Sequence, residues 1–331
     1  MMNCLANAGP SASTFRPPLG RLSQLRGCTT LPRQPRRADA PWPGERKPEM
    51  CVADRPIDVW DAQSFDPELT ACLAAHADLL AAYYARSNQI FLDHDHGRAR
   101  TLIRPENEHA ADVSELRETV GALMEERTIR AWHYTRLTDQ EVAALALAGV
   151  HLSTPASLRR RFDAVVAEGQ LTPAEVDLLW RHNMFNHQHD SRAGKFWAVS
   201  HPQRVDDSGV VFLMKHWGGE AASMWMKDEA VLSRLEAVGQ ARVLGVAMPL
   251  GQCEDFGGAA RAVIATFARA GGAVSEPSGF DLYAKVDLPG SAILEVQTER
   301  DANFAAMAQG YPSPFVDHGQ TYWKDLTGEE D

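Results

Sequence analysis

The chain has 331 residues, with 33 basic and 44 acidic side chains and a formal net charge of −11 at pH 7. A chain of this length buries one large core or two smaller ones. Its 44% hydrophobic and 23% charged residues are typical of a globular protein, which argues against a disordered or fibrous chain. No apolar run approaches the roughly 18 residues that a membrane-spanning helix needs.

The cysteines are few and scattered along the chain. Their number is odd and their spacing shows no pairs, which argues against a disulfide framework and against a zinc site. A reducing compartment suits such cysteines best, so we expect a cytoplasmic protein. The five positions are Cys4, Cys28, Cys51, Cys72 and Cys253.

The N-terminal segment differs in composition from the rest. Residues 1–38 contain six arginines and no acidic residue, so the remaining chain carries 27 basic and 44 acidic side chains, about −17 in formal charge. Residues 1–48 are rich in Pro, Gly and Ser, which predicts disorder. A flexible tail, a targeting peptide and translated sequence upstream of a start at Met50 remain open. The many prolines oppose the amphipathic helix of a targeting peptide, so we favour a dispensable tail or a mis-assigned start over residues 1–49.

Residues 50–127 are predicted to form a helical subdomain. Apolar residues recur at helical spacing from Leu69 to Tyr84, and again over Ala110–Glu126. The run Asp93-His94-Asp95-His96 between them invites a metal-site interpretation, but a solvated loop is the better one. We expect this subdomain to pack against the following one or to gate its site.

The segment 129–149 is the most informative in the chain. Residues 129–134 are rich in aromatic and β-branched types and predict a short strand that ends at His133. A polar Tyr-Thr-Arg turn, 134–136, follows. Thr138 and Glu141 then have the spacing of a capping box, and Gly149 suits a helix C-terminus. This pattern predicts an imidazole, a hydroxyl and a guanidinium at the mouth of a cleft.

Helices are predicted after Gly149, beginning at Thr154-Pro155 and at Thr172-Pro173. The run Arg159–Arg161 is expected to be a solvated face, although it could meet a pyrophosphate or a nucleic-acid backbone. The His-dense stretch 182–190 matches no zinc spacing, so a polar loop is preferred to a metal site.

The last third of the chain alternates strand and helix signals. Strands are predicted at 196–199, 209–213 and 241–250, a Gly-Gly turn at 218–219 leads into a helix, and another helix covers 259–270. Segments 280–286 and 292–298 are predicted to form a final strand pair about Pro289-Gly290.

In order along residues 129–300, the His turn, the aromatic residues and the terminal acid resemble the ADP-ribosyltransferase superfamily. The resemblance is to its His-containing branch, which includes the poly-ADP-ribose polymerases and the diphtheria-type toxins. It implies an α+β fold in which an ADP-ribosyltransferase-like split β-sheet core occupies residues 128–331, behind the N-terminal helical subdomain. The function implied is ADP-ribosyl transfer from NAD, the substrate, with release of nicotinamide.

The resemblance also assigns NAD contacts. His133 would hydrogen-bond the adenosine-side ribose, and the backbone of Tyr134 would hold the nicotinamide carboxamide. Thr135 would add a hydroxyl contact, and Arg136 would reach phosphate. Phe212 or Trp217 would form one wall of the nicotinamide pocket and Trp225 the other, although neither family tyrosine is present. These aromatic residues suit a protein core equally well.

The catalytic acid of the family stands at the start of the strand before the last one, which here is Asp281. Glu276, in the preceding loop, is the runner-up, and Glu295, inside the last strand, suits the role less well. Departure of nicotinamide leaves an oxocarbenium-like ribose, which a carboxylate stabilises. Aspartate is one methylene shorter than the usual glutamate.

The acceptor of ADP-ribose is open among proteins, nucleic acids and small molecules, and no membrane partner is indicated. The acidic body disfavours non-specific nucleic-acid binding, which phosphate contacts dominate. Toxin, defence and regulatory roles all fit. Two other classes remain: a non-catalytic NAD-binding or interaction module of the same fold, and a metal-dependent hydrolase built from His182, His187, His189 and Asp190.

Overall fold

The computed structural model describes residues 55–96, 103–275 and 278–307. The chain divides into two compact units, residues 1–49 and 50–331, and every described residue belongs to the second. The predicted tail, 1–49, and the candidate acid Glu276 therefore lie outside the described residues.

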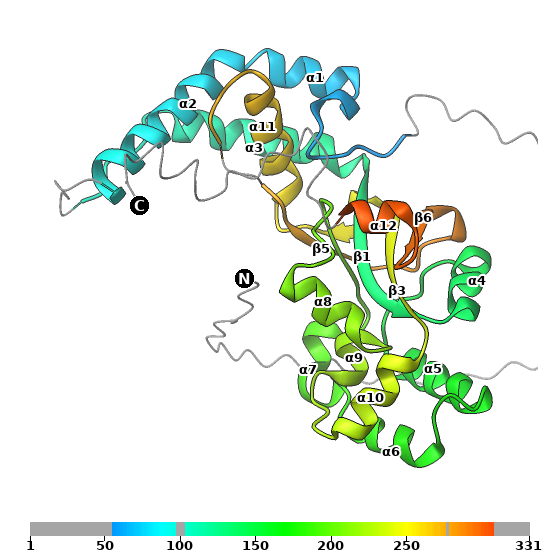
Figure 1. Cartoon of the computed structure of the whole chain (residues 1–331). Coiled ribbons are helices and arrows are strands. Elements are labelled where there is room, and N and C mark those ends of the chain that lie inside the picture. The colour runs from blue at the N-terminus through cyan, green and yellow to red at the C-terminus, as the bar shows by residue number, and fades with distance from the viewer. Residues whose placement is uncertain (1–54, 97–102, 276–277, 308–331) are drawn as a thin grey trace, which may run out of the picture. The chain divides into compact units, whose positions relative to one another are not determined.

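The described residues form an α+β fold built on one six-stranded antiparallel sheet (Figure 1). The strand order is β4-β5-β2-β1-β3-β6. The strands are β1 (Thr128–Leu137), β2 (Phe196–Val199), β3 (Gln240–Pro249), β4 (Cys253–Glu254), β5 (Asp281–Ala284) and β6 (Ile293–Thr298). The two central strands, β1 and β3, are the longest and the most deeply buried, so the core follows them.

The sheet is weakly joined between β1 and β2. Ten pairs of facing residues link β1 to β3, from Thr128 opposite Pro249 to Leu137 opposite Gln240. A single pair, Trp132 opposite Val199, links β1 to β2. The sheet therefore consists of one half with β1, β3 and β6 and another with β2, β5 and β4.

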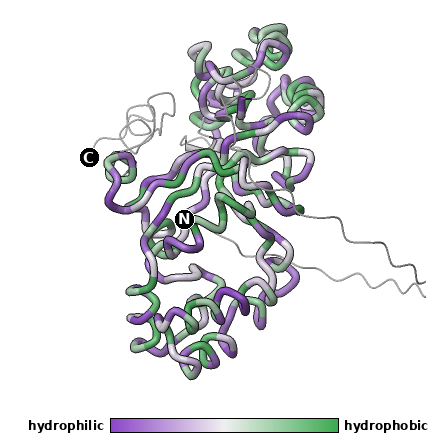
Figure 2. Tube along the Cα trace, turned by 90° about the vertical axis from the view of Figure 1, so that its right-hand side faces the viewer, coloured by the Kyte–Doolittle hydropathy of each residue, from purple (hydrophilic) through white to green (hydrophobic). Residues whose placement is uncertain are grey.

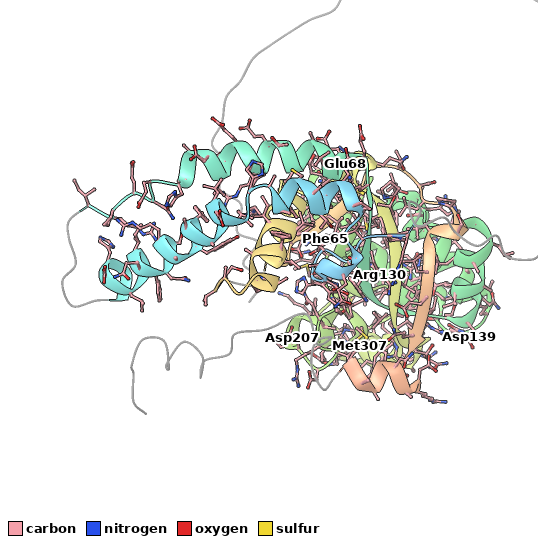
Figure 3. The ribbon with its side chains drawn as sticks, turned by 90° about the horizontal axis from the view of Figure 1, so that it is seen from above. Phe65, Glu68, Arg130, Asp139, Asp207 and Met307 are labelled. Carbon is pink, nitrogen blue, oxygen red and sulfur yellow. The ribbon has the colours of Figure 1, made fainter. Side chains whose placement is uncertain are left out.

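The N-terminal helices pack on a helix from the C-terminal part of the chain. Contacts join α3 to α1 and to α2, and join both α2 and α3 to α11 (Figure 3). The predicted helix 69–84 is two helices, because the chain bends at Ala75 and His76. These elements are η2 (Ala62–Ser64), α1 (Pro67–Ala74), α2 (Ala77–Ile90), the π-helical η3 (Phe91–His96), α3 (Ala110–Glu125) and α11 (Gly258–Ala270).

The predicted helix after β1 is present as α4 (Asp139–Ala148). Thr138 Oγ1 accepts a hydrogen bond from the Glu141 amide (3.2 Å), and Glu141 Oε2 accepts one from the Thr138 amide (2.8 Å), so the predicted capping box is confirmed. Gly149 ends the helix with φ of 83°, a conformation that glycine adopts without strain.

Helices between the strands form a second hydrophobic core. It gathers Phe162, Leu179, Trp217 and Leu235, which belong to segments far apart in the sequence. Figure 2 shows hydrophobic and hydrophilic colour alternating along the chain. The helices of this second core are α5 (Pro155–Ala167), α6 (Pro173–Arg181), α7 (Phe185–Arg192), α9 (Gly219–Ser223) and α10 (Glu229–Ala237). The buried residues of α8 (Ser208–Lys215) belong to the core of the sheet.

Two predicted elements have a different secondary structure. Residues 209–213, predicted as a strand, lie in α8, because the Asp207 carboxylate caps the amides of Gly209 and Val210 and because Val210 and Met214 share a buried helical face. The predicted polar loop 182–190 is largely helix α7, which bends at Gln188.

The last two strands do not pair with each other. β5 pairs with β2 and β4, whereas β6 pairs with β3 on the other side of the sheet. The connection through Pro289 contains the short helix η5 (Gly290–Ala292), and α12 (Ala302–Met307) follows β6.

No helix in the described ranges is both long and apolar enough to cross a bilayer. Within those same ranges, Cys72 and Cys253 are free thiols.

Candidate functional site

His133 lies in the middle of β1 and bridges the two halves of the sheet. Its Nδ1 is 2.8 Å from the carbonyl oxygen of Trp197 in β2, and its ring contacts Phe196 at 4.7 Å between centroids. A carbonyl only accepts hydrogen bonds, so Nδ1 carries the proton and Nε2 is left as an acceptor. Burial lowers the pKa of His133 to about 4, with the charge of Arg161 acting in the same direction and the hydrogen bond to Trp197 acting against it. The imidazole is therefore neutral near pH 7.

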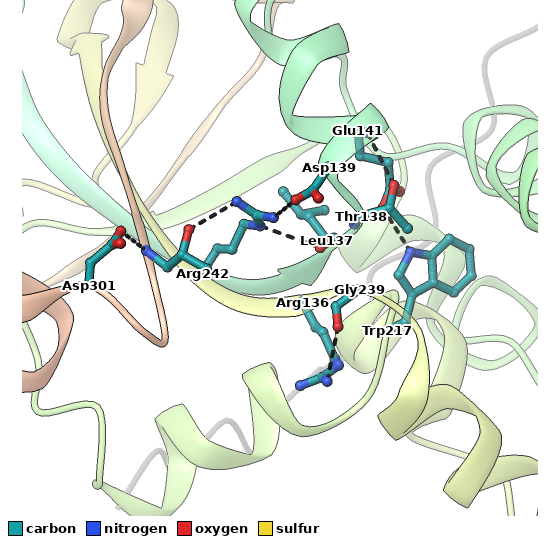
Figure 4. Close-up of polar contacts among 10 residues, drawn as sticks. Arg136, Leu137, Thr138, Asp139, Glu141, Trp217, Gly239, Arg242 and Asp301 are labelled. Atoms are coloured by element: carbon teal, nitrogen blue, oxygen red, sulfur yellow. Dashed lines mark hydrogen bonds and ion pairs between the residues drawn. The ribbon is translucent and has the colours of Figure 1, made fainter. Parts of the chain in front are cut away.

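The three residues after His133 are strand, not the predicted turn, since β1 continues to Leu137. The Tyr134 side chain is buried; its hydroxyl donates to the carbonyl of Gln203 (3.1 Å) and accepts from the amide of Gln203 (2.6 Å). Thr135 is buried rather than at a cleft mouth. Arg136 donates to the carbonyls of Val238 (2.9 Å) and Gly239 (3.1 Å; Figure 4).

Arg161 connects the neighbourhood of His133 to the second core. Its Nε is 2.6 Å from Glu141 Oε1, and its guanidinium lies 4.8 Å from the centroid of the Trp217 ring. The Trp217 indole also donates to Glu141 Oε2 at 2.8 Å (Figure 4). Glu141 therefore caps α4 and holds α5 at the same time.

The three predicted aromatic walls do not form one pocket. Trp217 is 0% exposed, so it presents no free face to a ligand. Phe212 is 40% exposed on α8, and Trp225 is 39% exposed after α9. Trp225 contacts the ring of His187, with 4.6 Å between the ring centroids.

Asp281 begins β5, opposite Val199 of β2. Burial raises the pKa of this carboxyl group, and the positive charge of Arg192 opposes the rise. Arg192 also pairs with Glu220 (3.3 Å) and lies 5.7 Å from the ring centroid of Trp197. Asp281 therefore has an aromatic and cationic environment, which its sequence neighbours did not indicate.

The pleat places His133 and Asp281 on opposite faces of the sheet. Ala284 is opposite Phe196, so it shares the face of the Phe196 ring that contacts His133. Side chains alternate along a strand, so Leu282 shares that face and Asp281 points to the other. Trp197 joins the two neighbourhoods, because its carbonyl binds His133 and its ring lies beside Arg192.

Glu295 shares a row with Asp281. The facing pairs run Asp281–Val199–Trp132–Gly245–Glu295 across five strands, so the two residues share a face and their backbones lie about 19 Å apart. Glu295 lies 3.6 Å from Arg130, which is labelled in Figure 3, and accepts from Gln297 (3.0 Å). Only one of these carboxylates can therefore serve a given ribose.

Metal-binding geometry is absent from the described part of the chain, which holds no cluster of three candidate ligands. His182 and His187 line a cavity with Trp225, whereas His189 and Asp190 form an exposed pair (3.2 Å). A second cavity, of about 430 Å³, is lined by Arg136 and Lys215 among others. Neither of these two cavities includes His133 or Asp281.

Sequence reasoning missed Phe196 and Arg192 as neighbours of the candidate residues. Phe196 follows from strand pairing, since it lies in the strand that His133 bridges. Arg192 has no comparable signal, because it ends a helix that the sequence did not predict. Comparison with known proteins adds no family: no family model, curated protein or solved structure matches the chain.

Proposed function

We propose that this chain is an NAD-dependent ADP-ribosyltransferase of the His-containing branch, with His133 in its NAD site. The observation that carries the proposal is the neutral imidazole at the junction of two sheet halves. Its Nε2 is an acceptor for a ribose hydroxyl, and its ring is fixed by Trp197 and Phe196. The near-separation of β1 from β2 supports a split-sheet core of the superfamily's type.

The proposed reaction breaks the bond between the ribose anomeric carbon and the nicotinamide nitrogen. Nicotinamide leaves with the electron pair, and an oxygen or nitrogen nucleophile forms the new bond. Asp281 is the carboxylate proposed to stabilise the ribosyl cation. Its strand is two strand spacings from β1, roughly 10 Å, and its side chain points to the face of the sheet opposite to His133, so a shared NAD would have to reach both faces. A protein or small-molecule acceptor in the cytoplasm suits the acidic chain.

A second candidate is NAD binding without turnover. The observation that favours it is the opposite orientation of Asp281 and His133. On the face of β5 that His133 shares, the described residues are Leu282 and Ala284, which carry no charge and are fully buried. A ligand held on that face alone would meet no acid from this strand.

Incubation of the purified chain with NAD separates the two candidates. Release of nicotinamide, with labelled ADP-ribose entering a lysate component or water, supports the transferase. NAD binding without nicotinamide release supports the binding module. Absence of both binding and release would overturn the proposal in either form.

A further inference from the structure

A cavity of about 360 Å³ lies among the helices of the second core, apart from the residues of the proposed NAD site. Its volume is within the range of small-molecule sites. The lining residues are Leu178, His182, His187, Trp225, Met226, Lys227 and Asp228. They come from α6, α7 and the segment that joins α9 to α10.

The cavity presents a planar aromatic surface. Trp225 is 39% exposed, which is unusual for so large an apolar side chain beside a cavity. The His187 ring stacks on it with centroids 4.6 Å apart and an angle of 34° between the planes, so the indole is held in place. Leu178 and Met226 add an apolar floor. Exposed rings of this kind bind other rings by stacking.

The polar groups of the cavity are two imidazoles, an ammonium and a carboxylate. Among the described residues, Lys227 and the ring of His182 have no hydrogen bond or ion pair. The one carboxylate, Asp228, is already engaged, because its Oδ1 accepts from the amides of Ala230 (3.0 Å) and Val231 (3.2 Å) at the start of α10. Asp228 keeps its negative charge in these hydrogen bonds, and Lys227 supplies the ammonium of the lining.

We propose that this cavity binds a small planar aromatic ring that carries an anionic group. The ring stacks on Trp225, the imidazoles of His182 and His187 bond to its heteroatoms, and the ammonium of Lys227 neutralises the anion. A nucleoside monophosphate and an aromatic carboxylate share this chemistry. The site is independent of whether the chain binds NAD.

Calorimetric titration of the full chain with adenosine 5′-monophosphate and with indole-3-acetate distinguishes these two sources. At least one is expected to bind with a Kd below about 1 mM. Adenosine and inorganic phosphate each offer half of the recognition and should bind more weakly. If neither anionic aromatic compound binds, the inference is wrong.

Variants locate the binding. Trp225→Ala should weaken it by roughly 5- to 150-fold, as loss of a stacking partner does, and Trp225→Phe should retain most of it. Lys227→Gln should weaken binding of the monophosphate but not of adenosine. Met224→Ala, at a neighbouring exposed side chain that does not line the cavity, is the matched control.

His133→Ala should leave the affinity for these compounds unchanged. Binding that survives Trp225→Ala but disappears in His133→Ala would place the ligand at the proposed NAD site and overturn this inference. If Trp225→Ala fails to fold, Trp225→Phe and Lys227→Gln test the inference instead. If Lys227→Gln weakens the binding of adenosine as much as that of the monophosphate, the role assigned to the ammonium is wrong.

Discussion

The burial of His133 between β1 and β2 has a direct consequence for its protonation. A ring whose pKa is about 4 stays neutral through the physiological range, so its Nε2 remains a hydrogen-bond acceptor. Any ligand hydroxyl at this position must therefore donate. The same property makes the acid stability of the fold depend on this side chain.

We expect stability to fall as pH drops from about 6.5 to about 4. In this window His133 binds a proton in the unfolded chain but not in the folded one, so protonation stabilises the unfolded state relative to the folded state. The free energy of unfolding falls by at most about 3 kcal/mol through this group. His201, whose pKa burial also lowers to about 4, adds to it. Denaturant unfolding from pH 4 to 8 measures the slope, and His133→Gln should reduce it. An unchanged slope would show that His133 titrates normally in the fold.

Asp281 is the residue on which turnover depends in the proposed reaction. Asp281→Asn keeps the shape but removes the charge, so NAD hydrolysis and transfer should fall by orders of magnitude while NAD affinity changes little. Glu295→Gln, in the same row of the sheet, is the matched control and should do less. Steady-state nicotinamide release measures both variants. Full activity in Asp281→Asn would remove this residue from the mechanism.

At the scale of single elements, Gly149 shows why a helix ends where it does. Its φ is 83°, and a Cβ there would collide with the backbone carbonyl of Leu288. Gly149→Ala should therefore lower the free energy of unfolding by several kcal/mol, which the midpoint of denaturant unfolding measures. Gly169→Ala is the matched control, because its φ is 71° but no atom lies within 4 Å of the added Cβ; it should cost only about 1 kcal/mol. Equal losses would mean that the collision relaxes freely.

The sequence predicted elements that local chemistry specifies. The helix starts at Thr138, Thr154 and Thr172 follow from capping residues, and all three capping boxes are present. Residues 209–213 were predicted wrongly as a strand, because β-branched apolar residues outweighed the capping signal of Asp207. The local sequence pattern also predicted that β5 pairs with β6, but each of them pairs with a strand that is distant in the sequence.

The candidate site was less predictable than the elements. The strand that carries His133 was predicted, but its extension through Arg136 depends on pairing with β3 along its whole length. Burial of Trp217 depends on helices that converge from different parts of the chain. The face on which Asp281 lies follows from its register with β2, which no local signal contains.

At the scale of the whole molecule, the described core uses residues from Ile57 to Phe304. Deleting residues 1–49 should leave the melting temperature and any activity unchanged, because this separate unit contributes few apolar residues. Thermal unfolding of the full and shortened chains, with nicotinamide release measured in parallel, checks this expectation. A large drop in melting temperature would show that the segment stabilises the fold.

The central claim is that NAD binds at His133, and calorimetric titration of NAD into matched variants tests it most directly. His133→Ala should weaken NAD binding at least tenfold without unfolding the chain. His76→Ala should leave the NAD affinity unchanged. The Nδ1 of His76 also bonds a backbone carbonyl, that of Cys72 at 2.9 Å, but His76 lies far from β1 in the sequence. Equal NAD affinity in the original chain, His133→Ala and His76→Ala, or no NAD binding at all, would contradict the claim.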